Sequence, residues 1–471
     1  MIDVAIIGAG PVGLLLGNLL GQRGHSVTVL EKQPAPYPMP RAIHFDGETM
    51  RVFQATGMAQ EILAHTHIGK GMLFKNAAGE TLIDWSRAQD IGPMGWFESY
   101  RFYQPGLEAA LRKGLSRFDD VVLHNGAEVA EITQTTDDTT LTLADGRTLK
   151  ARYAIGCDGT GSVTRNSLGI GLHDLGFQER WLVADLLLTN PQVDPGDYSI
   201  QFCDPDAPAT YVRGAGDWRR WEMRLREGEP DQPSDAAVWG KLTRWISPND
   251  AKLERAAVYT FRSRIAMAWQ QGRVFLAGDS AHQTPPFMGQ GMCAGVRDAA
   301  NLAWKLSAVL NGVDARLLAS YQSEREPNAR AFIEKTVALG RLINQTAAGH
   351  LPTGKMESLW PDLGSGLGPR DGIGGALVPQ VRVNGQLADD AMQNGFYILA
   401  ETDYPGSLPC VTGAIDWLRD KGVPGVIVRP DGYCLTGFAD AADLAAKAQI
   451  AADLNAHLTK PLAADPATRQ V

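Results

Sequence analysis

A glycine-rich turn near the N-terminus carries residue types suited to binding a phosphate group. Gly8, Gly10 and Gly13 have the spacing G-x-G-x-x-G and follow a short apolar segment. In a strand-turn-helix unit, the first glycine makes the tight turn, the second admits a pyrophosphate and the third lets helix and strand pack closely. The helix predicted to begin at Pro11 and Val12 would hold the phosphates with unpaired N–H groups at its positive end. The motif predicts a dinucleotide site, the alternative being a purely structural glycine turn.

An acidic residue follows at the distance expected for a ribose contact. Glu31 lies 18 residues beyond Gly13, at the end of a second apolar strand, and Lys32 comes next. A carboxylate at this position accepts hydrogen bonds from ribose hydroxyls and disfavours a 2′-phosphate. The bound nucleotide is therefore predicted to be FAD or NAD rather than NADP.

A second motif carries an acid at the end of another apolar strand. Asp158 follows the segment 153–155 and precedes Gly159, with Arg165 one helical stretch further on. This arrangement suits a second contact with the dinucleotide, although an Asp-Gly pair is by itself more often only a turn.

The third motif places another acid and two glycines before a helix. Asp279 follows Gly278 at a predicted strand end, where α/β sheets bind ligands, and could accept from a ribityl hydroxyl. Gly289 and Gly291 would let the next helix present bare N–H groups to a flavin. The dipole of that helix would stabilise negative charge on the N1–C2=O edge of the reduced ring. The alternative is an ordinary loop before a helix.

The segments that position these motifs show two kinds of hydrophobic pattern. Residues 1–60 have the pattern of a β-α-β unit, which returns at 149–168 and 273–310. Between them lie alternating segments such as 220–226, where three apolar residues would share one face of a half-exposed antiparallel strand and four charged residues the other. We therefore predict a discontinuous nucleotide domain (1–70, 101–172 and 262–345), an inserted sheet domain (71–100 and 173–261), a linker (346–370) and a C-terminal α/β domain (371–471).

Composition excludes several other classes of protein. The 471 residues are 44% hydrophobic and 21% charged, which is typical of globular domains, and the net charge of −9 disfavours nucleic acid as a partner. The five cysteines form no C-x-x-C pair, so neither a metal site nor a dithiol centre is predicted. No signal peptide or long apolar run occurs, and we expect a cytoplasmic protein without a membrane role.

Together, the three motifs resemble those of the FAD-dependent aromatic hydroxylases typified by para-hydroxybenzoate hydroxylase. The resemblance is strongest to the 3-(3-hydroxyphenyl)propionate hydroxylase and polyketide hydroxylase branch, and it covers residues 1–345 well and the C-terminal part loosely. It implies an α/β fold with a Rossmann-like FAD-binding domain, an inserted antiparallel-sheet substrate domain and a C-terminal thioredoxin-like domain.

The resemblance also implies a reaction. NADH or NADPH would act as a transient donor that reduces FAD, and O₂ would form a flavin C4a-hydroperoxide that hydroxylates a small phenolic substrate. Two alternatives stay open: epoxidation or Baeyer–Villiger oxidation of a polycyclic, polyketide-like substrate, and a flavin-binding regulator without turnover. The protein would be a monomer or a homodimer.

Site residues follow from the resemblance, position by position. Arg41 matches a family arginine near the flavin, Pro286 would sit close to the reacting edge of the ring, and many relatives carry Asn where Cys293 stands and Gly where Met288 stands. Cys293 is better interpreted as a buried filler than as a redox thiol. The predicted FAD contacts are Gly8, Gly10, Pro11, Val12, Gly13, Glu31, Lys32, Arg41, Gln104, Asp158, Gly278, Asp279, Pro286, Gly289, Gly291, Met292 and Cys293.

Substrate contacts are harder to predict, because packing explains most candidates equally well. His282 could shuttle a phenol proton, since its side chain titrates near neutral pH, but a structural hydrogen bond is the simpler interpretation. The other candidates lie on two neighbouring strands and in one loop: Tyr211, Arg213, Trp221, Arg224, Trp96 and Phe97.

Overall fold

A mostly parallel, eight-stranded sheet organises the N-terminal region. The computed structural model describes residues 1–471 except 205, 348–353, 356–358, 369–370 and 459–471. The sheet has the order β17-β18-β11-β1-β2-β8, with β10 and β9 as an antiparallel extension from β11. Its strands are β1 (Ile2–Ile7), β2 (Val27–Glu31), β8 (Val121–Asn125), β9 (Val129–Gln134), β10 (Thr139–Leu143), β11 (Thr148–Gly156), β17 (Gln270–Gln271) and β18 (Val274–Leu276).

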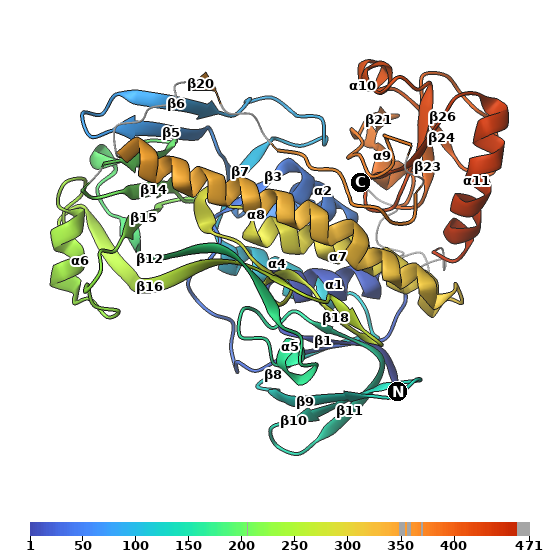
Figure 1. Cartoon of the computed structure of the whole chain (residues 1–471), viewed down its shortest axis with the longest axis horizontal. Helices are drawn as coiled ribbons and strands as arrows, with labels where there is room; N and C mark the ends of the chain where they lie inside the picture. The colour runs from blue at the N-terminus through green and yellow to red at the C-terminus, as the bar shows by residue number, and fades with distance from the viewer. Residues whose placement is uncertain (205, 348–353, 356–358, 369–370, 459–471) are drawn as a thin grey trace.

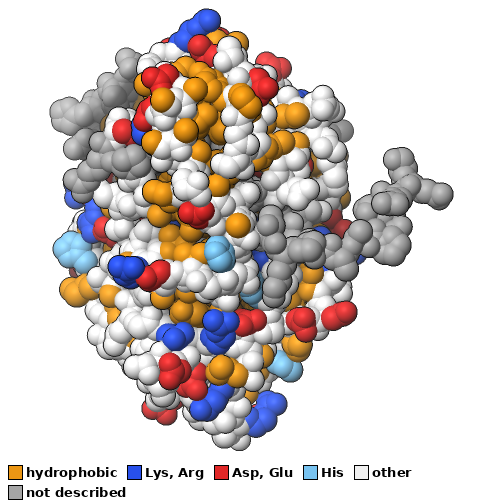
Figure 2. Space-filling model, turned by 90° about the vertical axis from the view of Figure 1, so that its right-hand side faces the viewer, with side chains coloured by type: hydrophobic (Ala, Val, Ile, Leu, Met, Phe, Trp, Pro, Cys, Tyr) orange, Lys and Arg blue, Asp and Glu red, His pale blue; other side chains and the backbone are white. Residues whose placement is uncertain are grey.

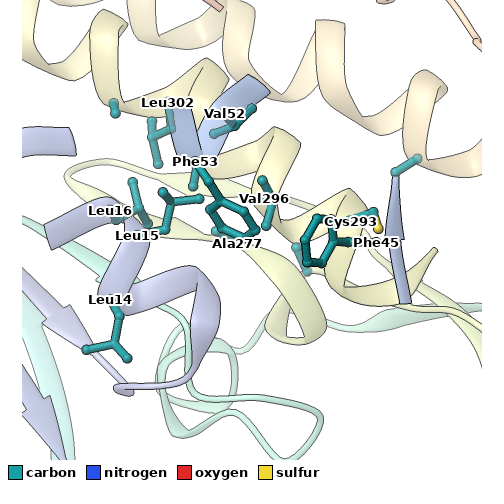
Figure 3. Close-up of a cluster of buried hydrophobic side chains, with 14 of the residues drawn as sticks. Leu14, Leu15, Leu16, Phe45, Val52, Phe53, Ala277, Cys293, Val296 and Leu302 are labelled. Atoms are coloured by element: carbon teal, nitrogen blue, oxygen red, sulfur yellow. The ribbon is translucent and has the colours of Figure 1, made fainter. Parts of the chain in front are cut away.

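Helices pack on this sheet and enclose the main apolar core. Side chains from α1, β3, α2 and α7 meet in this core, as Figure 3 shows for Leu15, Phe45, Phe53, Val296 and Leu302. The long α8 crosses the molecule alongside α7 (Figure 1). The helices of this region are α1 (Pro11–Gly21), α2 (Gly47–Ala55), α3 (Ala59–Leu63), α4 (Gln104–Leu115), α5 (Val163–Ser167), η2 (Gly278–Ser280), η3 (Pro286–Met288), α7 (Gly291–Leu310), η4 (Ala315–Ala319) and α8 (Ser320–Ala347).

A second sheet of nine strands extends away from the first. Its order is β19-β16-β12-β15-β14-β13-β5-β6-β20, with α6 (Asp235–Leu242) and η1 (Pro191–Val193) in its connections. A small sheet, β3-β7-β4, is formed by β3 (His44–Asp46), β7 (Ser99–Phe102) and β4 (Thr66–Ile68). The nine strands are β5 (Gly71–Asn76), β6 (Thr81–Ser86), β12 (Leu172–Leu188), β13 (Ser199–Cys203), β14 (Ala209–Arg213), β15 (Trp218–Arg224), β16 (Ala251–Ala266), β19 (His282–Gln283) and β20 (Gly354–Lys355).

The expectation of a solvated charged face on the strand within 220–226 is wrong. Arg220 and Glu222 are buried, with exposed fractions of 4% and 8%. Trp221 and Met223 do share the opposite face, in the apolar core under α6. Both faces of β15 are covered by other parts of the protein. The alternation of charged and apolar residues therefore predicted correctly which residues share a face, but not that the charged face is buried.

The C-terminal region forms a separate four-stranded sheet at the upper right of Figure 1. Its order β24-β23-β25-β26, with β23 parallel to β24 and antiparallel to β25, is the predicted thioredoxin-like arrangement. Hydrophobic side chains gather in the upper part of the face in Figure 2. The elements are β21 (Arg382–Val383), β22 (Gln386–Leu387), α9 (Ala388–Ala391), β23 (Tyr397–Ala400), β24 (Cys410–Thr412), α10 (Ile415–Lys421), β25 (Gly425–Val428), β26 (Cys434–Phe438) and α11 (Ala441–Ala456).

Buried polar contacts attach this C-terminal sheet to the helices of the first domain. Arg51 on α2 donates to both carboxylate oxygens of Asp389, at 2.5 and 2.8 Å. Tyr433 donates to Glu48 Oε1 at 2.6 Å, and Glu48 Oε2 accepts from Arg297 Nε of α7 at 2.6 Å. These contacts connect the turn before β26 to α7.

Two further observations concern the sequence predictions. None of the described helices is long and apolar enough to cross a membrane. Within the predicted linker 346–370, residues 348–353, 356–358 and 369–370 lie outside the described residues.

Candidate active site

A cavity of about 370 Å³ opens where the two large sheets meet. It is lined by the starts of α1 and α7, by the small sheet and by strands of the nine-stranded sheet. The lining therefore joins segments far apart in sequence. Its residues include Gly10, Pro11, Val12, Arg41, His44, Met72, Trp85, Arg87, Ser99, Arg101, Gln104, Ser199, Thr210, Val212, Arg220, Glu222, Gly278, Asp279, Thr284, Pro286, Met288, Gly289, Gly291 and Met292.

The glycine turn before α1 needs glycine for packing at two positions and leaves open space at the third. Gly8 has φ +103°, and a Cβ there would lie 2.4 Å from the Cys157 carbonyl oxygen. A Cβ on Gly13 would lie 2.0 Å from the Gly8 carbonyl oxygen, so both positions exclude any side chain. At Gly10, which lines the cavity, a Cβ would meet nothing within 4 Å. The open position is where a ligand can approach the backbone.

The start of α7 faces the same cavity and has no capping side chain. Gln290 occupies the N-cap position without a side-chain cap hydrogen bond, and Gly291 and Met292 line the cavity. The first N–H groups of a helix have no partner within the helix. Since α1 also begins without a side-chain cap, two positive helix ends meet at one cavity.

Asp279 presents a carboxylate to the cavity. It makes no hydrogen bond to any of the described residues, although its side chain is reachable from the cavity. The side chain of Asp279 is exposed, and the protein packed around it raises its pKa, while His282 and Arg41 act in the opposite direction. An unpartnered acceptor beside a cavity is what a hydroxyl-bearing ligand requires.

A pair of hydrogen bonds fixes the loop that carries Arg41. Gln104 Oε1 accepts from the N–H groups of Arg41 and Ala42, at 3.0 and 2.7 Å. From the other side, Arg220 donates to the carbonyl oxygens of Pro40 and Arg41, both at 2.6 Å. The guanidinium of Arg41 lies 4.9 Å from the centre of the Tyr37 ring. The loop is therefore held from both large domains.

His282 lies beneath the cavity floor rather than on it. Its Nε2 is 2.6 Å from Asp298 Oδ2, and the same oxygen accepts from the Gly278 N–H at 3.0 Å. Burial would raise the pKa of Asp298, but His282 and Arg325 outweigh that effect and lower it. The buried group supports the turn at Gly278 and does not reach the cavity.

The structure separates the predicted flavin contacts into two groups. Those on the cavity are Gly10, Pro11, Val12, Arg41, Gln104, Gly278, Asp279, Pro286, Gly289, Gly291 and Met292. Glu31 accepts from the N–H of Ala9 at 2.8 Å, and one oxygen of Asp158 caps α5 while the other is buried without a partner. Off the cavity lie Gly8, Gly13, Glu31, Lys32, Asp158 and Cys293, whose pKa burial raises to about 12.

The predicted substrate residues do not come together at the cavity. Tyr211 and Trp221 belong to the apolar core under α6, and the Tyr211 hydroxyl donates to the Gly196 carbonyl at 3.1 Å. Arg213 donates to the Gly216 carbonyl and pairs with Asp197, while Arg224 is paired with Glu179. The sequence pattern did not reveal which strand face would meet the cavity.

Other side chains occupy the positions expected of substrate contacts. Arg101 and Glu222 are buried cavity residues, 7% and 8% exposed, and neither was predicted from the sequence. Burial raises the pKa of Glu222, and its nearest cation is Arg220 Nη1 at 3.7 Å. The only sequence signal was the charged alternation of β15, which indicated a face but not its neighbours.

Comparison with known proteins assigns the family. The sequence matches the FAD binding domain family model over residues 1–336. The chain belongs to the FAD-dependent aromatic hydroxylases. This hydroxylase is 35% identical to a probable NADH-specific resorcinol 4-hydroxylase of Rhodococcus jostii (strain RHA1), over 95% of its own length and 94% of the relative's. It is 38% identical to a 3-(3-hydroxy-phenyl)propionate/3-hydroxycinnamic acid hydroxylase of Mycobacterium sp. (strain JLS), over 73% of its length but only 61% of that protein.

Solved structures share the fold of the hydroxylase across all its domains. Aklavinone-11 hydroxylase, solved with FAD and aklavinone, superposes with a TM-score of 0.80 at 24% identity and covers 97% of this chain and 99% of its own. The flavin-dependent monooxygenase PieE, solved with FAD and substrate, gives 0.81 at 19% identity, covering 97% and 98%. The predicted α/β fold with a Rossmann-like FAD-binding region is thereby confirmed.

The residues on the cavity fit FAD chemically. The open backbone at Gly10 and the uncapped helix starts suit a pyrophosphate and the electron-rich edge of a flavin. Asp279 supplies an acceptor for a ribityl hydroxyl. Among the described residues, no cluster of His, Cys, Asp or Glu could hold a metal ion.

Proposed function

We propose that the hydroxylase oxygenates a small phenolic ring, using NADH or NADPH and O₂. The observation that carries the proposal is that one cavity is lined both by two uncapped helix starts and by buried Arg and Glu side chains. FAD at the helix starts would supply the oxygen-transfer chemistry. The named substrates of the relatives, resorcinol and 3-(3-hydroxyphenyl)propionate, are both phenols.

The chain's own residues would bind and orient the flavin. Gly10, Pro11 and Val12 would contact the pyrophosphate, and Asp279 would accept from the ribityl chain. The N–H groups at Gly291 and Met292 would hold negative charge on the ring edge. Glu31, Asp158 and Lys32 would contact the adenosine end, outside the main cavity.

The substrate would lie beside Pro286 against an apolar wall formed by Met72, Trp85 and Val212. Glu222 would accept the phenol proton, because it is a buried carboxylate with no hydrogen bond to the described residues. Burial raises its pKa, which brings it nearer the neutral range where a general base works best. A deprotonated phenol is the electron-rich form that an electrophilic oxygen attacks.

The division of the chain into domains follows the same proposal. FAD would be held by 1–70, 101–172 and 262–345, the substrate by 71–100 and 173–261, and the C-terminal segment 371–471 would act structurally or in forming a homodimer.

Product mass tests the proposed activity directly. Purified protein is loaded with FAD and given NADH or NADPH, air and a panel of phenols, hydroxyphenylpropionates and polycyclic phenols. We expect products heavier by one oxygen atom and NAD(P)H oxidation that rises with substrate. Polycyclic products carrying an epoxide or an inserted ring oxygen would favour the alternative reaction. Hydrogen peroxide as the only product across the panel would contradict the oxygenase.

A further inference from the structure

Arg101 is a buried cation with almost no partner. It occupies the middle strand of the small sheet, opposite His44 on one side and His67 on the other, and is 7% exposed. Its Nε makes no hydrogen bond, and its Nη2 makes one long contact of 3.4 Å to the Gly71 carbonyl oxygen. Within the described ranges, it forms no ion pair with any carboxylate. A buried guanidinium is usually paired, so this arrangement calls for an explanation.

The electrostatic surroundings of Arg101 add to this deficit. Burial, together with the neighbouring Arg87 and Arg213, lowers its pKa to about 10. The group is still charged at neutral pH, because its pKa lies well above 7. Arg87 also lines the cavity, with its guanidinium 4.4 Å from the centre of the Trp85 ring. The side chains of Arg87 and Arg101 therefore both line the cavity, together with the Glu222 carboxylate.

Another cavity arginine shows the opposite arrangement. Arg220 donates to Asp185 at 2.7 Å and to two backbone carbonyl oxygens, so its donors are used within the protein. The difference between the two residues is therefore one of partners and not of burial. Of these two arginines, Arg101 is the one whose donors are left for a bound molecule.

We propose that Arg101 binds an oxyanion of the substrate, either a carboxylate or a second phenolic oxygen. A planar guanidinium offers parallel N–H donors that match a carboxylate, and hydrogen bonds to charged groups are the stronger kind. The substrate is then an aromatic ring with a phenol near Pro286 and an oxygen substituent reaching Arg101. This inference rests on the proposed function and narrows its substrate class.

Binding measurements with two pairs of compounds distinguish the two sources of the oxyanion. The first pair is 3-(3-hydroxyphenyl)propionate and its primary amide, and the second is resorcinol and 3-methoxyphenol. Dissociation constants are measured on the FAD-loaded protein by isothermal titration calorimetry, without NAD(P)H, so no turnover is needed. We expect the wild type to prefer the propionate over its amide, or resorcinol over 3-methoxyphenol, by about tenfold or more.

Variants at Arg101 assign the preference to its side chain. Arg101→Gln should reduce the preference to within about twofold, and Arg101→Lys should keep part of it, because lysine retains the charge without the parallel donors. The matched control is Arg224→Gln, on the nine-stranded sheet and off the cavity, which should bind both pairs as the wild type does. Flavin content and thermal unfolding of each variant check that it is folded.

The binding preferences of the wild type and of Arg101→Gln decide whether Arg101 binds the substrate and which oxygen group it binds. Loss of preference in the propionate pair identifies a carboxylate substrate, and loss in the resorcinol pair identifies a phenolic oxygen. A wild type with no preference in either pair overturns the inference even if Arg101→Gln does not fold, and so does a folded Arg101→Gln that keeps the preference. Failure of the hydroxylase proposal would instead appear as the absence of oxygenated products while the binding preference persists.

Discussion

Replacing Asp279 by Asn separates a ligand contact from a structural one. The carboxylate has no hydrogen bond to the described residues, so the apoprotein loses no contact when the charge is removed. The FAD complex would exchange a hydrogen bond to a charged acceptor for a weaker one to the neutral amide oxygen of Asn, a loss of about 1–1.5 kcal/mol. Since about 1.4 kcal/mol corresponds to a factor of ten, we expect FAD to bind about 5- to 12-fold more weakly.

The stability of the Asp279→Asn apoprotein should change in the opposite direction. The protein packed around Asp279 raises its pKa above the value in the unfolded chain. The folded form therefore binds this proton more tightly, and the free energy of unfolding falls as pH rises through the raised pKa. Asn has no ionisable proton, so the free energy of unfolding of the variant should match or exceed that of the wild-type apoprotein at pH 7–8. This range is chosen because the carboxyl group of Asp279 is fully ionised there.

Flavin fluorescence titration of the apoprotein measures FAD affinity, and thermal unfolding at several pH values measures stability. The matched control is Asp137→Asn, at an exposed position in the loop between β9 and β10, which should change neither quantity. If Asp279→Asn bound FAD within about threefold of the wild type, the loss of affinity would be smaller than a hydrogen bond to a charged acceptor predicts. That result would refute the placement of the ribityl chain.

Three other changes test separate parts of the site. Gly13→Ala should abolish FAD retention and lower the melting temperature, because its Cβ would lie 2.0 Å from the Gly8 carbonyl oxygen; flavin absorbance and calorimetry measure both. Glu222→Gln should lower phenol turnover by about 10²–10⁴-fold. It should also remove the rise of kcat/KM with pH, a rise that lies above the usual glutamate range because burial raises this pKa. Asp389→Ala should cost about 3–5 kcal/mol in chemical denaturation, because it leaves the buried Arg51 unpaired.

Each of these changes has a control within the chain. Gly240→Ala, in α6 with nothing within 4 Å of the new Cβ, should keep FAD and gain slight stability. Glu61→Ala removes the exposed pair with Lys113 and should cost less than about 1 kcal/mol. For Glu222, the Asp variant should retain a pH-dependent limb. Equal effects of Asp389→Ala and Glu61→Ala, or an unchanged pH profile in Glu222→Gln, would contradict the corresponding argument.

The sequence predicted the cofactor side of the site better than the substrate side. The glycine turn and Asp279 each belong to a short local motif, and the spacing within each motif determines its geometry. Arg101 and Glu222 line the same cavity only because distant strands pair. Strand alternation assigns a residue to a face without specifying what covers that face. The charged residues of β15 were therefore expected in water, whereas two of them are buried at the cavity.

The contacts between Tyr433, Glu48 and Arg297 have a consequence for the C-terminal sheet. Arg297 also donates to Gln290 at 3.0 Å and to Asp46 at 2.5 Å, so the series ends at the first turn of α7. A ligand that binds only while this turn is in place disfavours, by mass action, the opening motions that separate the C-terminal sheet from α7. Amide hydrogen exchange in β25 and β26, which do not line the cavity, should therefore slow when the nucleotide is added. The exchange rate of the C-terminal sheet would then report whether the nucleotide is bound.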